Sequence, residues 1–132
     1  MTPDEGRKRI VFHAAGPVEG SFLEMLRPYR GVRDEVLRGV YLALRACASM
    51  VSTEAVPRDL VSALWAISYF GRLWAIDPGG MLRRNKLISD DDLAKLEEFL
   101  AHFDYAVGAL LGGNDLTEAF HGLEQSRWRT GG

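Results

Sequence analysis

The residues of this chain that are capable of chemistry include a Glu-x-x-His pair, Glu118 and His121. Residues three positions apart share one face of a helix, and ferritin-like di-iron proteins place metal ligands at this spacing. Such a site needs a second pair of the same kind and further glutamates, and the sequence has no second Glu-x-x-His. We therefore predict neither a metal site nor a cofactor, and we interpret the pair as part of a solvated helix face.

The remaining reactive side chains carry no catalytic signature. Histidine titrates near neutral pH, but the sequence around His13, His102 and His121 specifies no carboxylate that would orient them. Cys47 falls on the apolar stripe of its expected helix, where a free cysteine is usually a small buried hydrophobe. No Gly-x-Ser-x-Gly, phosphate-loop, dinucleotide or His-Glu-x-x-His motif is present. The sequence thus assigns no catalytic residue and favours a non-enzymatic protein, although it does not decide the question.

Basic side chains form two clusters that have the chemistry to bind an anion. One comprises Arg83, Arg84 and Lys86 in a loop over residues 77–88, and the other comprises Arg27, Arg30 and Arg33 around Tyr29. Guanidinium and ammonium groups bind phosphate or an acidic protein surface. The alternative is a solvated loop, or one that pairs with the acidic helix expected over residues 90–104. We favour this alternative, because exposed basic residues are common and surface pairs contribute little.

The strongest signal concerns residues 60–76, which are almost continuously apolar and contain one charge, Arg72. One side of the helical wheel carries Leu60, Leu64, Ile67, Gly71 and Trp74, and much of the other carries Val61, Trp65, Tyr69, Leu73 and Ile76. A helix that is apolar all round lies inside a bundle, against a partner chain or in a membrane. A spanning helix needs about 20 apolar residues, so we predict no membrane insertion.

Part of this helix is a candidate for partner binding. Trp65 and Tyr69 lie on the same arc as polar residues that should face water, and tryptophan, tyrosine and arginine are favoured in protein interfaces. Core packing is the alternative reading. The predicted partner-binding residues are Val61, Trp65, Tyr69 and Arg72, together with Arg83, Arg84 and Lys86 of the basic loop.

The elements around this helix predict an all-α fold, a single compact bundle of three main helices with short flanking helices. Helices are expected from about Phe22 to Pro28, over residues 33–52, and after caps at Ser89 and at Asn114 or Asp115. Residues 1–20 should form an irregular arm, in which Arg9–His13 can be read as a short strand. The helical domain then covers residues 21–126, with a frayed tail over 127–132. The expected core comprises Val40, Leu44, Cys47, Leu64, Ile67, Leu96, Phe99, Phe103 and Val107.

Composition and charge narrow the function classes. The 132 residues are 47% hydrophobic and 26% charged, as in ordinary globular domains. The net charge is −2 and the aromatic residues fall in helix stripes, so we predict no nucleic-acid partner. Residues 1–88 carry 13 Lys/Arg against 9 Asp/Glu, whereas residues 89–126 carry 1 against 9, which makes the C-terminal helices acidic. One cysteine and no secretory apolar run indicate a cytoplasmic protein.

Two functional hypotheses follow. The first is a small protein that acts by binding protein, through self-association as a homodimer and through a further partner, as an immunity protein, antitoxin or adaptor does. The second is a small-molecule-binding or enzymatic bundle with an anion site at the basic loop 77–88. The first predicts an exposed apolar patch, and the second predicts a concave pocket with convergent polar groups.

Overall fold

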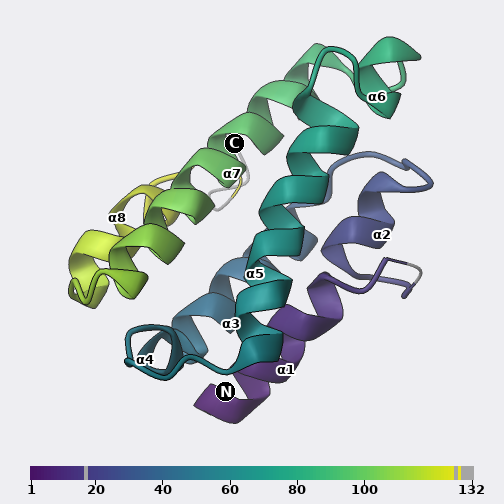
Figure 1. Ribbon diagram of the computed structural model, residues 1–132. Coiled ribbons are helices and arrows are strands. Elements are labelled where there is room, and N and C mark those ends of the chain that lie inside the picture. The colour runs from purple at the N-terminus through teal and green to yellow at the C-terminus, as the bar shows by residue number, and fades with distance from the viewer. Residues whose placement is uncertain (17, 127, 129–132) are drawn as a thin grey trace.

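A computed structural model describes residues 1–16, 18–126 and 128, and over these residues the protein is all-α, without a β-strand. The helices are α1 (Pro3–His13), α2 (Phe22–Leu26), α3 (Asp34–Ala46), α4 (Ala48–Val51), α5 (Arg58–Gly71), the π-helical η1 (Arg72–Ile76), α6 (Met81–Arg84), α7 (Asp90–Leu111) and α8 (Leu116–Glu124). Helix α5 lies between α1 and α2 on one side and α7 on the other (Figure 1). No helix in the described part of the chain is long and apolar enough to cross a bilayer.

The prediction of an irregular N-terminal arm is wrong for residues 3–13, which form α1 rather than a strand. The Thr2 hydroxyl accepts a 3.1 Å hydrogen bond from the Glu5 N–H, and the Glu5 carboxylate accepts one from the Thr2 N–H. This capping box, with Pro3 at the first helical position, satisfies the free donors of the helix start. Gly6 lets α1 approach α3, because a Cβ there would lie 2.7 Å from the Ala43 carbonyl oxygen.

The helix expected over residues 33–52 is interrupted at Cys47, which separates α3 from the single turn of α4. The cap predicted at Ser89 is confirmed, because Ser89 accepts a 3.1 Å hydrogen bond from the Asp92 N–H. Ser21 caps α2 in the same way, by accepting a 3.1 Å hydrogen bond from the Glu24 N–H. These caps position α2 against the core and set the start of α7.

The predicted core residues are buried, except that Val107 is only half-buried. The prediction of a frayed tail is wrong at Trp128, which is fully buried. Its indole packs edge-on against Tyr41 and Phe99, with ring centroids 5.9 and 5.6 Å apart. The rest of that predicted tail, residues 127 and 129–132, lies outside the described residues.

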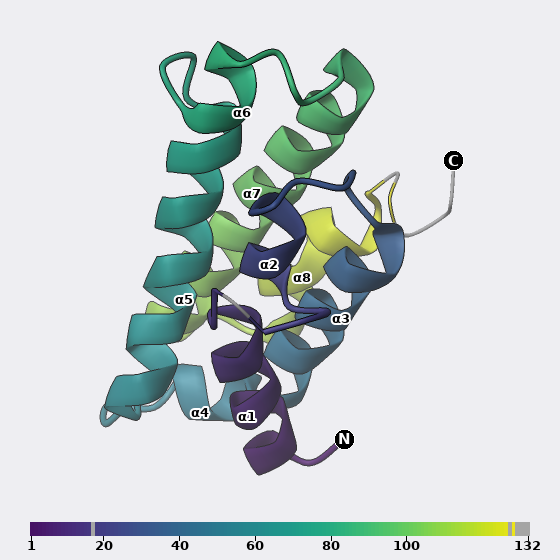
Figure 2. The same ribbon diagram turned by 90° about the vertical axis from the view of Figure 1, so that its right-hand side faces the viewer.

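The connection over residues 77–88 contains the short helix α6, which packs against η1 beyond the C-terminal end of α5 (Figure 2). Neither Gly79 nor Gly80 in this connection has a positive φ angle. Gly80 is required for space instead, because a Cβ there would lie 2.2 Å from the Leu73 carbonyl oxygen. The residue with positive φ in this connection is Lys86, at 55°, which ends α6.

Candidate functional site

The outer face of α5 and η1 exposes one row of large apolar side chains. These are Val61, Trp65, Tyr69 and Leu73, which are 44, 57, 45 and 39% exposed, and we call this row the ridge. The spacing of four residues places them one above the other on the helix. The side chains that the helical wheel places opposite the ridge are buried, apart from the half-buried Trp74. Hence the predicted partner-binding residues Val61, Trp65 and Tyr69 lie at the surface rather than in the core.

The aromatic rings of the ridge are held in place by one another. Trp65 and Tyr69 stack with their centroids 4.5 Å apart and their planes within 11°. The ring of Phe70 meets both of them edge-on, at 5.9 and 5.1 Å. Because these contacts fix the rings within a single chain, a partner that bound the ridge would lose little side-chain entropy there.

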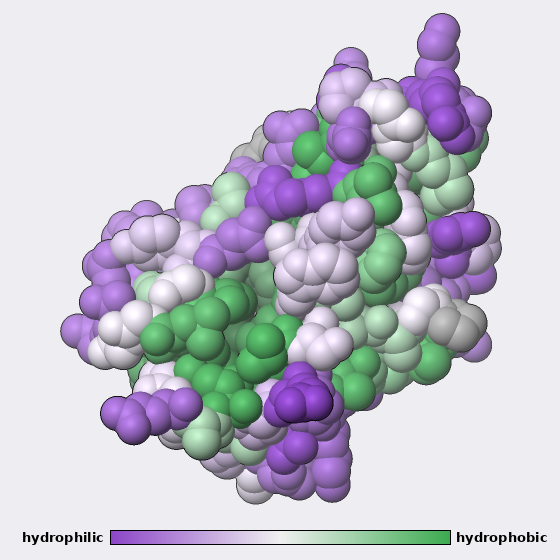
Figure 3. Space-filling model, in the orientation of Figure 1, coloured by the Kyte–Doolittle hydropathy of each residue, from purple (hydrophilic) through white to green (hydrophobic). Residues whose placement is uncertain are grey.

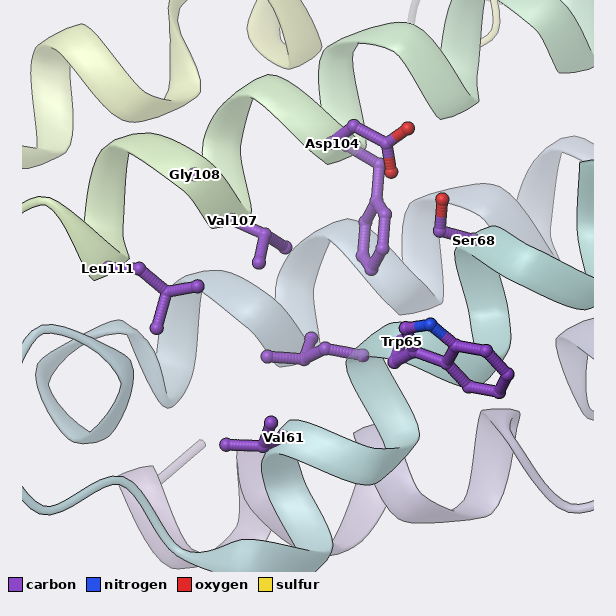
Figure 4. A pocket seen from close by; sticks show the side chains of 9 residues that line it. Val61, Trp65, Ser68, Asp104, Val107, Gly108 and Leu111 are labelled. Atoms are coloured by element: carbon purple, nitrogen blue, oxygen red, sulfur yellow. The ribbon is translucent and has the colours of Figure 1, made fainter.

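A groove of about 360 Å³ runs beside the ridge, between α5 and α7. It is lined by Val61, Leu64, Trp65, Ser68, Phe103, Asp104, Val107, Gly108 and Leu111, and we call it the α5–α7 groove. In Figure 4, Val107 and Leu111 of α7 point toward the α5 side chains across this space. Hydrophobic residues gather at the same place on the surface in Figure 3. The groove is therefore an apolar depression between two helices rather than a polar pocket.

The polar end of the groove is occupied by an ion pair within the chain. The Arg72 guanidinium donates to one carboxylate oxygen of Asp104, with nitrogen–oxygen distances of 2.5 and 3.2 Å. Arg72, a predicted partner-binding residue, is thus already paired, although both side chains remain partly exposed. The pair neutralises this end, and the other polar groups among the lining side chains are the Ser68 hydroxyl and the Trp65 indole N–H.

A second depression of about 340 Å³ continues along the other half of the ridge. It is lined by Tyr69, Arg72, Leu73, Ile76 and Asp77, and we call it the η1 groove. Asp77 closes its end and accepts a 3.0 Å hydrogen bond from the Gly79 N–H. At the opposite end of α5, Arg58 is exposed. Two apolar depressions thus lie beside the ridge. The acidic Asp77 lies beyond one end of the ridge, and the basic Arg58 lies beyond the other.

The basic loop is not part of either groove. Arg83, Arg84 and Lys86 are exposed at the turn beyond the end of α5, and the Arg83 guanidinium donates a 2.9 Å hydrogen bond to the Ile76 carbonyl oxygen. None of the three lines the α5–α7 groove or the η1 groove. The predicted partner-binding residues therefore fall in two places: four on the outer face of α5 and η1, and three at the loop.

The other basic cluster is engaged within the chain, but its arginines contact Glu24 and Trp74 and not the acidic helix over residues 90–104 that the alternative interpretation named. Arg30 and Arg33 lie 3.0 and 3.7 Å from the buried carboxylate of Glu24. Tyr29 donates a 2.5 Å hydrogen bond to Asp92, and its pKa is raised by burial and by this bond. Arg27 lies over the Trp74 ring, 5.4 Å from its centroid. These contacts hold the segment after α2 against α7 and η1.

Three of the reactive side chains, those of His13, Cys47 and Glu118, are buried or hydrogen-bonded within the chain. His13 is buried, its Nδ1 accepts a hydrogen bond from the Phe22 N–H, and its Nε2 has no partner. Burial, and secondarily the nearby Arg9, lowers the pKa of His13 to about 4. Burial raises the pKa of the Cys47 thiol to about 11. Glu118 accepts a hydrogen bond from Tyr105, and no group of three metal-ligating side chains occurs among the described residues.

Sequence reasoning missed the α7 side of the site, namely Asp104, Gly108 and Leu111. One signal was available at Gly108. A glycine inside a helix lowers helix stability by about 1 kcal/mol relative to alanine, so its presence there suggests a packing or functional role. At Gly108 a Cβ would meet nothing within 4 Å, so close packing within the chain does not require this glycine. Its lack of a side chain instead keeps the groove open.

Comparison of the chain with protein-family models, with curated proteins and with solved structures found no match.

Proposed function

We propose that this protein acts by binding protein through the ridge, and that it self-associates there as a homodimer. The observation that carries the proposal is the ridge, four large apolar side chains exposed in one row with their two aromatic rings stacked. Stacked, partly exposed tryptophan and tyrosine beside an apolar depression are the features of an interface hot spot. Contiguous apolar patches of this kind on a monomer are often functional.

The small-molecule alternative has less support from the geometry. A ligand site needs several polar groups that converge on a pocket. The α5–α7 groove offers Ser68 and Asp104, and Arg72 already engages Asp104. The basic loop that this alternative assigned to an anion lies outside both grooves. Protein binding in the cytoplasm, in a role such as that of an immunity protein, antitoxin or adaptor, therefore remains our proposal.

Sedimentation velocity over a range of micromolar concentrations tests the proposal. The wild-type protein should sediment as a species larger than the monomer, and Trp65→Asp should dissociate it, because a carboxylate in the interface centre would be buried without a partner. Leu42→Asp is the matched control, since Leu42 is a similarly exposed apolar residue on α3, outside the ridge and both grooves. A wild-type protein that sediments as a monomer throughout, or a dimer indifferent to Trp65→Asp, would contradict self-association through the ridge.

A further inference from the structure

We propose that the occupant of the two grooves is the ridge of a second copy of this chain, with the two α5 helices antiparallel about a twofold axis. This inference rests on the proposed function and adds to it the surface that the second copy's ridge enters and the relative orientation of the two copies. In this arrangement, the Tyr69 and Leu73 side chains of one copy enter the α5–α7 groove of the other. Val61 and Trp65 of the same copy enter the other's η1 groove.

The first argument is the internal symmetry of the face. An isologous interface requires a surface that is complementary to itself, so that each contact occurs twice. We place the twofold axis beside α5, midway between Trp65 and Tyr69. Trp65 of one copy then lies opposite Tyr69 of the other, and Val61 of one copy lies opposite Leu73 of the other. Each half of the ridge then lies beside one of the two grooves, and every large exposed side chain of the row meets apolar surface.

The second argument is charge complementarity at this register. The same axis brings Arg58, at the start of α5, next to Ile76 and Asp77 of the second copy. Arg58 is exposed and its basic group has no acidic partner among the described residues, whereas Asp77 is exposed and uses one carboxylate oxygen for the Gly79 N–H. The twofold axis creates this ion pair at both ends of the interface. A parallel arrangement would instead bring the two Arg58 side chains together.

The third argument compares the available area with what a dimer needs. Aromatic side chains bury about 150–250 Å² each, so the half-exposed Trp65 and Tyr69 contribute on the order of 200 Å². With Val61, Leu73 and Leu111 the apolar patch reaches on the order of 400–500 Å², which is within the range of the largest patches on monomers. A standard interface covers about 800 Å² on each partner, of which the apolar centre is the larger share. The patch therefore has the size of an interface centre, with Arg58, Arg72, Asp77 and Asp104 as its polar rim.

Filling the α5–α7 groove from within tests the inference while leaving the ridge intact. Gly108→Leu places a side chain in the groove, and the fold tolerates it because a Cβ at this position meets nothing within 4 Å. We expect the dimer dissociation constant to rise at least about tenfold, the scale of a hot-spot loss. Thr117→Leu, which adds the same side chain at an exposed position of α8, should leave dimerisation unchanged. Thermal melting of each variant checks that the fold is retained.

Complementation then tests the reciprocal docking. A mixture of Tyr69→Ala, which leaves the lining of the α5–α7 groove unchanged, and Gly108→Leu, which keeps the ridge, should form heterodimers more tightly than either variant forms homodimers. Each homodimer loses the contact of Tyr69 with the α5–α7 groove at both symmetry-related places. In the heterodimer, Tyr69 of the Gly108→Leu chain enters the unaltered α5–α7 groove of the Tyr69→Ala chain, so this contact is kept once. Fluorescence energy transfer between differently labelled chains measures this exchange.

The charge pair tests the antiparallel register. Arg58→Asp should weaken the dimer, and Arg58→Asp combined with Asp77→Arg should restore it. A dimer that becomes tighter with Arg58→Asp would overturn the antiparallel arrangement. If Trp65→Asp dissociates the dimer while Gly108→Leu and Arg58→Asp leave it intact, the grooves are not the docking site and the inference fails, although the proposed function stands. A wild-type monomer at all concentrations overturns both.

Discussion

The inner and outer faces of α5 carry similar apolar side chains but have different surroundings. Leu60 and Ile67 on the inner face are fully buried, and at Gly71 a Cβ would lie 3.1 Å from Leu100 and 3.2 Å from Phe22. On the outer face, the ridge finds no covering element in the described part of the chain. The comparison shows that an apolar sequence makes a helix face favour burial. Whether another element of the same chain covers that face depends on the rest of the fold.

The largest expected effect is a difference in the free energy of unfolding between truncation of an inner-face residue and truncation of an outer-face residue of α5. Ile67→Ala should lower the free energy of unfolding by about 2–5 kcal/mol, because it opens a cavity in the core. Val61→Ala should change it by less than about 1 kcal/mol in dilute solution, because Val61 is about half exposed. Urea denaturation of both variants, at concentrations where the protein is monomeric, measures the difference. Equal losses would mean that the outer face contributes to the monomer's own core.

A smaller effect comes from pH and involves only the inner side of the molecule, where α1 packs against α5. The pKa of His13 is about 4 in the folded protein and about 6.5 when unfolded, so the unfolded chain binds the proton first as pH falls. The free energy of unfolding should therefore decrease between about pH 6.5 and pH 4, by roughly 3 kcal/mol at most, and the histidine contributes no further loss below that.

The measurement is urea denaturation across this pH window for the wild-type protein and for His13→Gln, which cannot titrate there. The difference between the two curves isolates the histidine from the carboxylates that also take up protons near pH 4. Dimerisation should stay constant between pH 7.5 and 6, because no histidine lines the ridge or the grooves. A wild-type curve that runs parallel to that of His13→Gln would refute this role of His13.

The smallest effect marks where the outer face ends. Arg84→Glu combined with Lys86→Glu should leave the sedimentation of the proposed dimer unchanged. It should change the free energy of unfolding by less than about 0.5 kcal/mol, the usual range for exposed sites. Both residues lie beyond the η1 groove. Loss of the dimer in this double variant would extend the interface to the basic loop, and loss of stability would make the loop structural.

The fold could be predicted where the sequence has periodicity, and it was missed where tertiary contacts decide. Residue spacing separates the two sides of α5, and the capping residue Ser89 identifies the start of α7. In contrast, α1 buries only Gly6, Ile10 and His13, which form no apolar stripe, so caps and close packing on α3 define it. Trp128 is a single apolar residue in a polar segment, and only the three-dimensional fold places it in the core.

The candidate site was half predictable for a related reason. Its α5 side is one continuous segment, so the helical wheel identified Val61, Trp65 and Tyr69. The α7 residues of the site lie more than thirty positions further along the sequence than the α5 residues. The periodicity of a single helix contains no information on which faces of two helices pack together. The basic clusters show the same limit. The position of Glu24 places Arg30 in an ion pair, whereas no carboxylate among the described residues pairs with Arg83, Arg84 or Lys86 at the loop.

Cys47 gives the molecule an internal reporter of opening. Its thiol is fully buried at the break between α3 and α4, and its raised pKa keeps it protonated at neutral pH. Only the thiolate reacts readily with alkylating reagents, so modification must await a transient exposure of the core. Because this is the one cysteine of the chain, the alkylation rate of the wild-type protein reports how often α3 and α4 separate from their neighbours. No label needs to be introduced for that measurement.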